Sequence, residues 1–132
     1  MARFFPFMLL AVIAYGVTVA ALGIPLSREL VSMGLPSGSA FTLTVSELLL
    51  TFATIVLFFE LVSAASTKSR SLLSHGLSMV VFIACGLIFL FVPGFGTGTF
   101  VIITLMSLVD VIAGYSISIL TARRDMILGN GE

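Results

Sequence analysis

The chain has 132 residues, of which 59% are hydrophobic and 9% are charged, and its formal net charge is zero. About a quarter of the residues of a soluble domain are charged, so this composition predicts a membrane protein. The six basic residues are scattered along the chain and form no basic stripe of the kind that binds a phosphate backbone. We therefore expect the lipid bilayer as a partner, and no nucleic acid.

Four apolar segments are long enough to cross a hydrocarbon core, which requires about 20 residues. They cover roughly residues 4–24, 41–63, 72–92 and 98–121. The connections between them are too short to bury a core of their own. The sequence therefore predicts one domain over residues 1–132, an all-α integral membrane protein of four antiparallel transmembrane helices with short loops.

The three connections differ in composition. The first, IPLSRELVSMGLPSGSA, contains two prolines and two glycines, which end the first helix. Within it, Ser27 is expected to cap one helical turn from Arg28 to Met33 that rests on the membrane interface. The second connection, ASTKSRS, is polar and basic, and the third, VPGFGTG, predicts a tight hairpin.

The basic residues predict the orientation. Five of them lie at the N-terminus, in the second connection and at the C-terminus, whereas only Arg28 lies in the first or third connection. Basic residues of short loops remain in the cytoplasm, so we expect both termini there, in a bacterial inner (plasma) membrane. The alternative is a cleaved signal peptide, because TVAA at residues 18–21 resembles a cleavage site. The first apolar run is longer than a usual signal core, which favours a retained helix.

A carboxylate, Asp110, lies near the middle of the fourth segment. At 100° per residue, Ser107, Gly114 and Ser118 share its helix face. Gly114 and Ser118 form a pair of small residues that allows another helix to approach closely. A central carboxylate costs about 3 kcal/mol on insertion, which the apolar residues of the span offset. Asp110 is therefore tolerable without a function, although acids within membranes often mark contacts or pathways.

Other polar side chains are expected near the depth of Asp110. Counting residues along each span places Tyr15, Thr51 and Thr54 there, where they would form a polar cluster. Glu47 shares a face with the two threonines and would extend the cluster into a track from the outer surface. In the alternative, Glu47 reaches to the interface and the threonine hydroxyls bond to their own backbone.

Glu60 and His75 are expected at similar depths near the cytoplasmic ends of the second and third segments. They are candidates for an ion pair or a hydrogen bond that closes this helical hairpin. A solvated histidine beside Lys68 and Arg70 is the alternative, and His75 is the one group whose ordinary pKa lies near neutral pH.

The sequence suggests no catalytic set, no metal site and no cofactor. The single histidine and single cysteine are expected at different depths, and the glycine-rich GFGTG at residues 94–98 joins two spans, not a strand and a helix. Our leading hypothesis is therefore a non-enzymatic accessory or assembly subunit that packs through the Asp110 face against a larger membrane protein or a second copy. The alternative is a homo-oligomeric, ion- or proton-coupled transporter of small solutes, with Asp110 and Glu47 as carriers.

Overall fold

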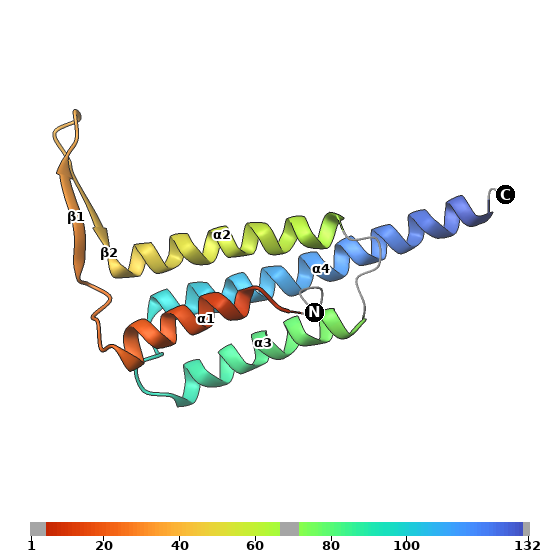
Figure 1. Cartoon of the computed structure of the whole chain (residues 1–132), viewed down its shortest axis with the longest axis horizontal. Helices are drawn as coiled ribbons and strands as arrows, with labels where there is room; N and C mark the ends of the chain where they lie inside the picture. Colours follow the sequence, from red (N-terminus) through yellow and green to blue (C-terminus); the bar gives the residue numbers. More distant parts are fainter. Residues whose placement is uncertain (1–4, 67–71, 131–132) are drawn as a thin grey trace.

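The computed structural model describes residues 5–66 and 72–130. The chain is mostly helical, and its four helices lie side by side and alternate in direction (Figure 1). In chain order the elements are α1 (Met8–Gly16), a π-helical turn η2 (Val17–Ala21), β1 (Glu29–Gly34), β2 (Ala40–Thr44), α2 (Val45–Ser66), α3 (Leu72–Phe91) and α4 (Gly98–Asn130). The two strands form a hairpin that stands crosswise at one end of the bundle, called here the hairpin end.

Two of the described helices are long and apolar enough to cross a membrane. They are Val45–Ala65 of α2 and Gly98–Ser116 of α4, whereas the apolar stretches Met8–Ala21 and Gly76–Phe91 are shorter. The four helices expected from the sequence are thus present as helices. The length and composition needed for a membrane span are met by two of them.

The first helix is shorter than predicted. The nine residues of α1 and the five of η2 give about 21 Å at 1.5 Å per residue, against about 30 Å of hydrocarbon. Its last turn is widened, because the N–H of Leu22 bonds to the carbonyl of Val17 at 2.8 Å. Gly23 follows with a φ of 66°, a conformation that only glycine adopts readily, and the helix ends there.

The first connection folds as an antiparallel β-hairpin, so the helical turn predicted from Arg28 to Met33 is wrong. Residues 29–34 pair with residues 40–44, and the second helix consequently begins at Val45, four residues later than expected. The tip contains Gly38 with a φ of 89°. A single helical turn is costly to nucleate, whereas the alternating side chains on both sides of this turn favour paired strands.

The last helix is longer than predicted. It has 33 residues, or about 50 Å, and continues to Asn130 instead of ending near residue 121. Figure 1 shows α4 extending past the ends of the other helices.

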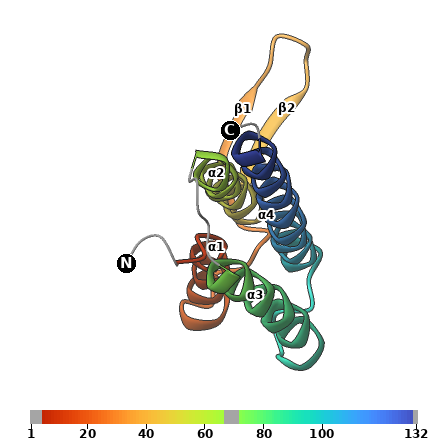
Figure 2. The same ribbon diagram turned by 90° about the vertical axis from the view of Figure 1, so that its right-hand side faces the viewer.

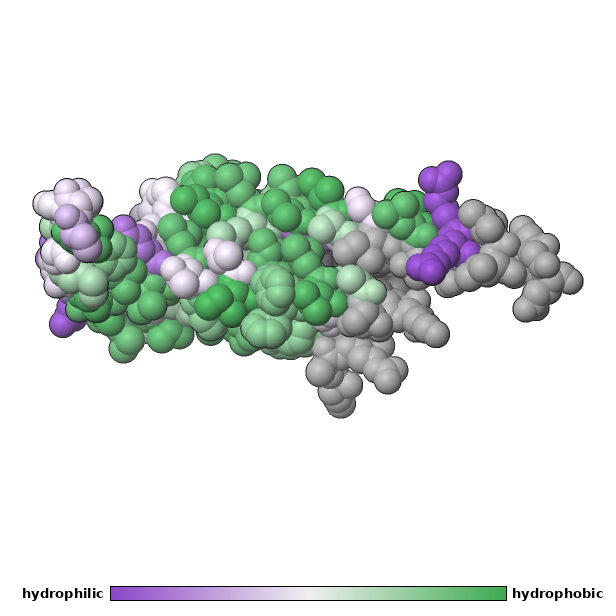
Figure 3. All heavy atoms as spheres, turned by 90° about the horizontal axis from the view of Figure 1, so that it is seen from above, coloured by the Kyte–Doolittle hydropathy of each residue, from purple (hydrophilic) through white to green (hydrophobic). Residues whose placement is uncertain are grey.

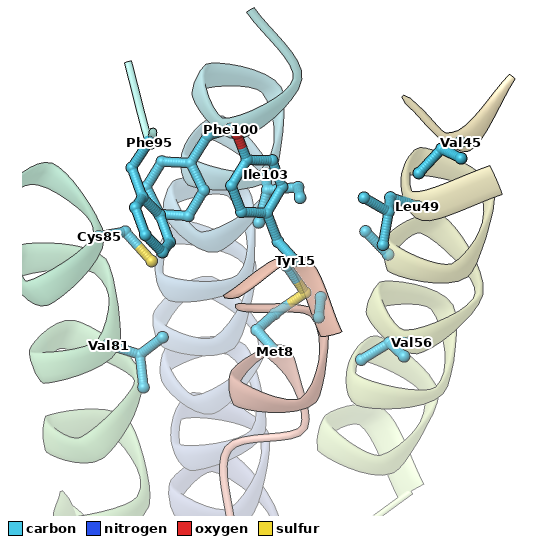
Figure 4. Close-up of a cluster of buried hydrophobic side chains, with 12 residues drawn as sticks. Met8, Tyr15, Val45, Leu49, Val56, Val81, Cys85, Phe95, Phe100 and Ile103 are labelled. Carbon is cyan, nitrogen blue, oxygen red and sulfur yellow. The ribbon is translucent and has the colours of Figure 1, made fainter. Parts of the chain in front are cut away.

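The core lies where α1 and α4 meet their neighbours. Each of these two helices contacts the other three, and α2 and α3 lie on opposite sides of them (Figure 2). Figure 4 shows the aromatic part of the core, in which Tyr15 lies beside Phe95 and Phe100. Outside the core, hydrophobic residues cover the middle of the visible face and hydrophilic ones gather toward its two ends (Figure 3).

Candidate functional site

Two carboxylates are buried inside the bundle, and the register of α2 and α4 brings them to similar depths. The two helices run in the same direction (Figure 1), and the hydroxyls of Ser46 and Thr99 form a hydrogen bond of 2.5 Å near their N-terminal ends. Counting from this bond at 1.5 Å per residue, Glu60 lies about 21 Å along α2 and Asp110 about 16 Å along α4. The two acids are thus separated by about one helical turn in depth.

The side chain of Glu60, a residue of α2, lies beside the N-terminal end of α1. Its side chain is 1% exposed, and its Oε2 accepts a hydrogen bond of 3.0 Å from the backbone N–H of Phe7. Phe7 directly precedes α1, where N–H groups have no partner within the helix and the helix dipole is positive. The carboxylate of α2 therefore caps the N-terminal end of α1.

Asp110 lies on the inward face of α4. Its side chain is 2% exposed and that of Ser107 is 1% exposed, and Gly114 is buried as well. The side chain of Ser118 lies outside the described residues. This face packs within the chain, so it is not an outward docking surface. The spacing predicts a helix-packing face, but spacing alone does not distinguish a helix of the same chain from a helix of a partner.

Ser107 also links α4 to α3. The Sγ atom of Cys85 lies 4.0 Å from its hydroxyl, and the hydroxyl donates to the carbonyl of Ile103 at 3.3 Å. Cys85 is 1% exposed and packs as a small core residue, as its apolar surroundings in the sequence indicate.

Tyr15 does not join Asp110. Its hydroxyl donates to the carbonyl of Gly94 at 3.0 Å and lies 2.6 Å from Oγ1 of Thr97, in the connection between α3 and α4. Thr97 precedes Asp110 by thirteen residues, about 20 Å along the helix axis. The cluster expected around Asp110 therefore does not include Tyr15. Depth counting failed because it assumed that the first helix crosses the full depth of the bundle, whereas α1 and η2 together have 14 residues, about 21 Å.

The threonines of α2 bond to their own helix. The hydroxyl of Thr51 donates to the carbonyl of Glu47 and that of Thr54 to the carbonyl of Leu50, both at 2.8 Å. Both threonines are exposed on the bundle. The sequence left two interpretations open, a polar track and threonines bonded to their own backbone, and these bonds have the geometry of the second. The described bonds do not form a polar track toward Asp110.

Glu47 caps α2. Its Oε2 accepts the backbone N–H of Thr44 at 2.9 Å, and its own N–H donates to Oγ1 of Thr44 at 3.5 Å. This reciprocal pair is a capping box, which the sequence analysis missed. The signal was visible as TVSE at residues 44–47, directly before an apolar run.

For the expected pair of Glu60 and His75, the structure describes the side chain of Glu60, and the side chain of His75 lies outside the described residues. Within the described part of the chain, no three His, Cys, Asp or Glu residues come close enough to hold a metal ion.

The larger described cavities are apolar. One of about 450 Å³ lies between α1 and α3, with Leu9, Val12 and Val81 among its lining residues. Another of about 460 Å³ lies between α1 and α2, lined by residues that include Leu10 and Phe59. Apolar cavities of this kind suit lipid chains or apolar side chains better than a polar substrate.

No family model matches the chain, and comparisons with curated proteins and with solved structures likewise find no match. Its function therefore has to be inferred from its own residues.

Proposed function

We propose that this chain is a small multi-pass protein of a bacterial inner membrane, with four membrane-crossing helices and both termini in the cytoplasm. Its role is non-enzymatic: it is an accessory or assembly subunit that packs against a larger membrane protein or a second copy. The apolar middle of the bundle (Figure 3) supports the location. The distribution of basic residues supports the orientation.

The observation that carries the proposal is the extension of α4. Continuing the register set by Ser46 and Thr99, the last residue of α2, Ser66, is level with Ile119. Residues 120–130 of α4 therefore continue past the end of α2 by about 16 Å. In proteins most of the stability of a helix comes from packing against its neighbours and not from intrinsic propensity. This extension gains stability when another protein packs beside it.

From this extension the proposed contact continues along the outward seam of α4, opposite the Asp110 face, which ends at Ile119 where the extension begins. Its first four members recur at alternating spacings of three and four residues, typical of left-handed packing between two helices, and the fifth follows two helical turns later. Their exposed fractions range from 41% to 58%. The seam consists of Ile102, Leu105, Val109, Ile112 and Ile119. The Asp110 face then holds the bundle together, and the opposite face binds the partner.

Purification in a mild detergent tests this proposal. The wild-type chain should elute as a complex with a partner or with a second copy. Ile112→Trp, in the centre of the seam, should release the chain as a monomer. Ile83→Trp is the matched control, because Ile83 is 51% exposed on α3, and it should leave the complex intact. A monomeric wild type, or equal loss in both variants, contradicts the proposal.

The two buried carboxylates favour a second candidate function, ion- or proton-coupled transport of small solutes by a homo-oligomer. Charged groups within a membrane are costly and often belong to proton or ion pathways. Glu60 and Asp110 are at most 2% exposed and lie at similar depths. Because Glu47 is exposed on the bundle, whereas Glu60 is buried, the carriers in this candidate are Asp110 and Glu60 and no longer Asp110 and Glu47.

Proton flux into liposomes that contain the purified chain tests the second candidate. Asp110→Asn and Glu60→Gln should each abolish the flux, because a neutral amide does not exchange the proton. Glu47→Gln, at an exposed carboxylate, should leave it unchanged. Absence of flux with the wild type, or full flux with both inner variants, rejects transport.

A further inference from the structure

The β-hairpin has one apolar face and one small or polar face. Residues that are directly opposite each other in an antiparallel pair point to the same side of the sheet. The pairs Val31 with Leu43 and Met33 with Phe41 form the apolar face. The alternate pairs form the other face: Ser32 with Thr42 and Gly34 with Ala40.

The apolar face is uncovered in the described structure. Val31 is 42% exposed, Met33 51% and Phe41 43%. No charged residue occurs from position 30 to position 46. An isolated two-stranded hairpin is at best marginally stable in water, and uncharged strand edges invite aggregation there. The hairpin would therefore be stabilised by an apolar surface that covers this face.

The orientation of the hairpin shows where that surface lies. In Figure 1 the strands run crosswise to the helices. Figure 2 looks along the helix axes, and in it the two strands are seen side by side. The sheet is thus roughly parallel to the plane of a membrane that the helices cross. β2 ends at Thr44 and α2 begins at Val45, so the hairpin lies at the level where α2 enters the membrane. It extends beyond α2 on the side away from α1 and α3 (Figure 2).

The sequence at the junction indicates that the apolar face is turned toward the helices. Leu43 and Leu48 occupy the positions of a hydrophobic staple around the cap Thr44, in which the first side chain folds down onto the second. The apolar face of the sheet is therefore the one on the same side as α2.

We propose that the hairpin is an interfacial anchor that lies on the bilayer surface beside α2. Its apolar face is immersed in the boundary between headgroups and acyl chains, about 5–10 Å deep, and its Ser32 and Thr42 face points to the headgroups and water. From Leu30 around the tip to Thr44 the hairpin has no charged residue, which suits the boundary between headgroups and acyl chains. This inference rests on the proposed membrane location and is independent of the proposed partner of α4.

Tryptophan fluorescence of the full chain in phosphatidylcholine vesicles tests the anchor. The chain contains no tryptophan, so each substitution introduces a single reporter. Phe41→Trp reports from the apolar face and Thr42→Trp from the opposite face, one residue away. With bromine on the lipid acyl chains, the emission of Phe41→Trp should be quenched at least twofold more than that of Thr42→Trp, and its maximum should lie at shorter wavelength.

Two further reporters keep the outcomes distinct. Ile83→Trp, on the exposed side of α3, reports whether the bundle crosses the bilayer, and Met33→Trp repeats the measurement on the apolar face. If Ile83→Trp is quenched but the two hairpin reporters are not, the anchor is overturned and the membrane location stands. Unquenched, short-wavelength emission at Phe41→Trp means that protein covers this face, which also overturns the anchor. An unquenched Ile83→Trp overturns the membrane location itself, and the anchor with it.

Discussion

The backbone N–H of Phe7 donates a hydrogen bond of 3.0 Å to Oε2 of Glu60, so a carboxylate of α2 closes the beginning of α1. α1 has nine residues, too few for a stable isolated helix. Its other contacts with the bundle include Tyr15, two residues before η2, whose hydroxyl bonds to the connection before α4. The shortest helix is thus attached to α2 at one end and to the α3–α4 connection at the other.

Removal of the Glu60 carboxylate should loosen α1. We expect Glu60→Ala to lower the free energy of unfolding by about 1–3 kcal/mol, the usual loss when a buried donor is left without its acceptor. Glu60→Gln retains an oxygen acceptor and should lose less. Denaturation in mixed micelles, followed by circular dichroism, measures both variants. Equal stability of Glu60→Ala and the wild type would show that this bond contributes nothing to the bundle.

The bond between Tyr15 and Thr97 should appear as a coupling energy. In a double-mutant cycle of Tyr15→Phe and Thr97→Val, we expect the two changes to be non-additive by about 0.5–1.5 kcal/mol, because they share one hydrogen bond. Thr104 is the control, since its hydroxyl donates to the carbonyl of Phe100 in its own helix. Tyr15→Phe and Thr104→Val should therefore add. Additivity in both cycles would argue against the bond to Thr97.

The sequence predicted the positions of the helices well, but it did not predict which residues of neighbouring helices face each other. Long apolar runs place α2, α3 and α4 to within a few residues at their N-terminal ends, because a helix satisfies the backbone hydrogen bonds of an apolar stretch within the stretch itself. Periodicity groups Asp110 with Ser107 and Gly114 on one face of its helix, but it does not reveal that Glu60 of another helix faces inward at a similar depth. The similar depth of the two acids depends on the register between α2 and α4. The hydrogen bond between the hydroxyls of Ser46 and Thr99 defines this register, and no local sequence pattern encodes it.

The hairpin was missed for a different reason, because its signal was present. Val31, Ser32, Met33 and Gly34 alternate in polarity, as do Ala40 to Thr44, and PSG lies between the two stretches. Such alternation around a turn predicts paired strands. The expectation of a uniform membrane helix bundle, in which loops are only connections, concealed it.

Gly94 should resist substitution where Gly96 does not. Gly94 has a φ of 88°, and its carbonyl accepts the hydroxyl of Tyr15. Gly94→Ala should cost about 1–2 kcal/mol, because a Cβ disfavours this conformation. No positive φ occurs at Gly96, and a Cβ there meets nothing within 4 Å. Gly96→Ala should be neutral or slightly stabilising. The same denaturation measurement compares the two, and equal effects would contradict the role of the Gly94 conformation.

The capping box at the start of α2 makes a prediction that separates a cap from a carrier of protons. Glu47→Ala should lower stability by about 1 kcal/mol, since the N–H of Thr44 loses its acceptor. Thr44→Ala should lower it by a similar amount. Glu47→Gln should be nearly neutral, because glutamine serves in a capping box as well as glutamate does. Hydrogen exchange at the backbone of residues 44–48 should rise in the alanine variants and stay unchanged in Glu47→Gln. A Glu47→Gln variant as unstable as Glu47→Ala would show that the charge itself is needed at this position, and the acid at the hairpin end would again be a candidate for proton or ion binding.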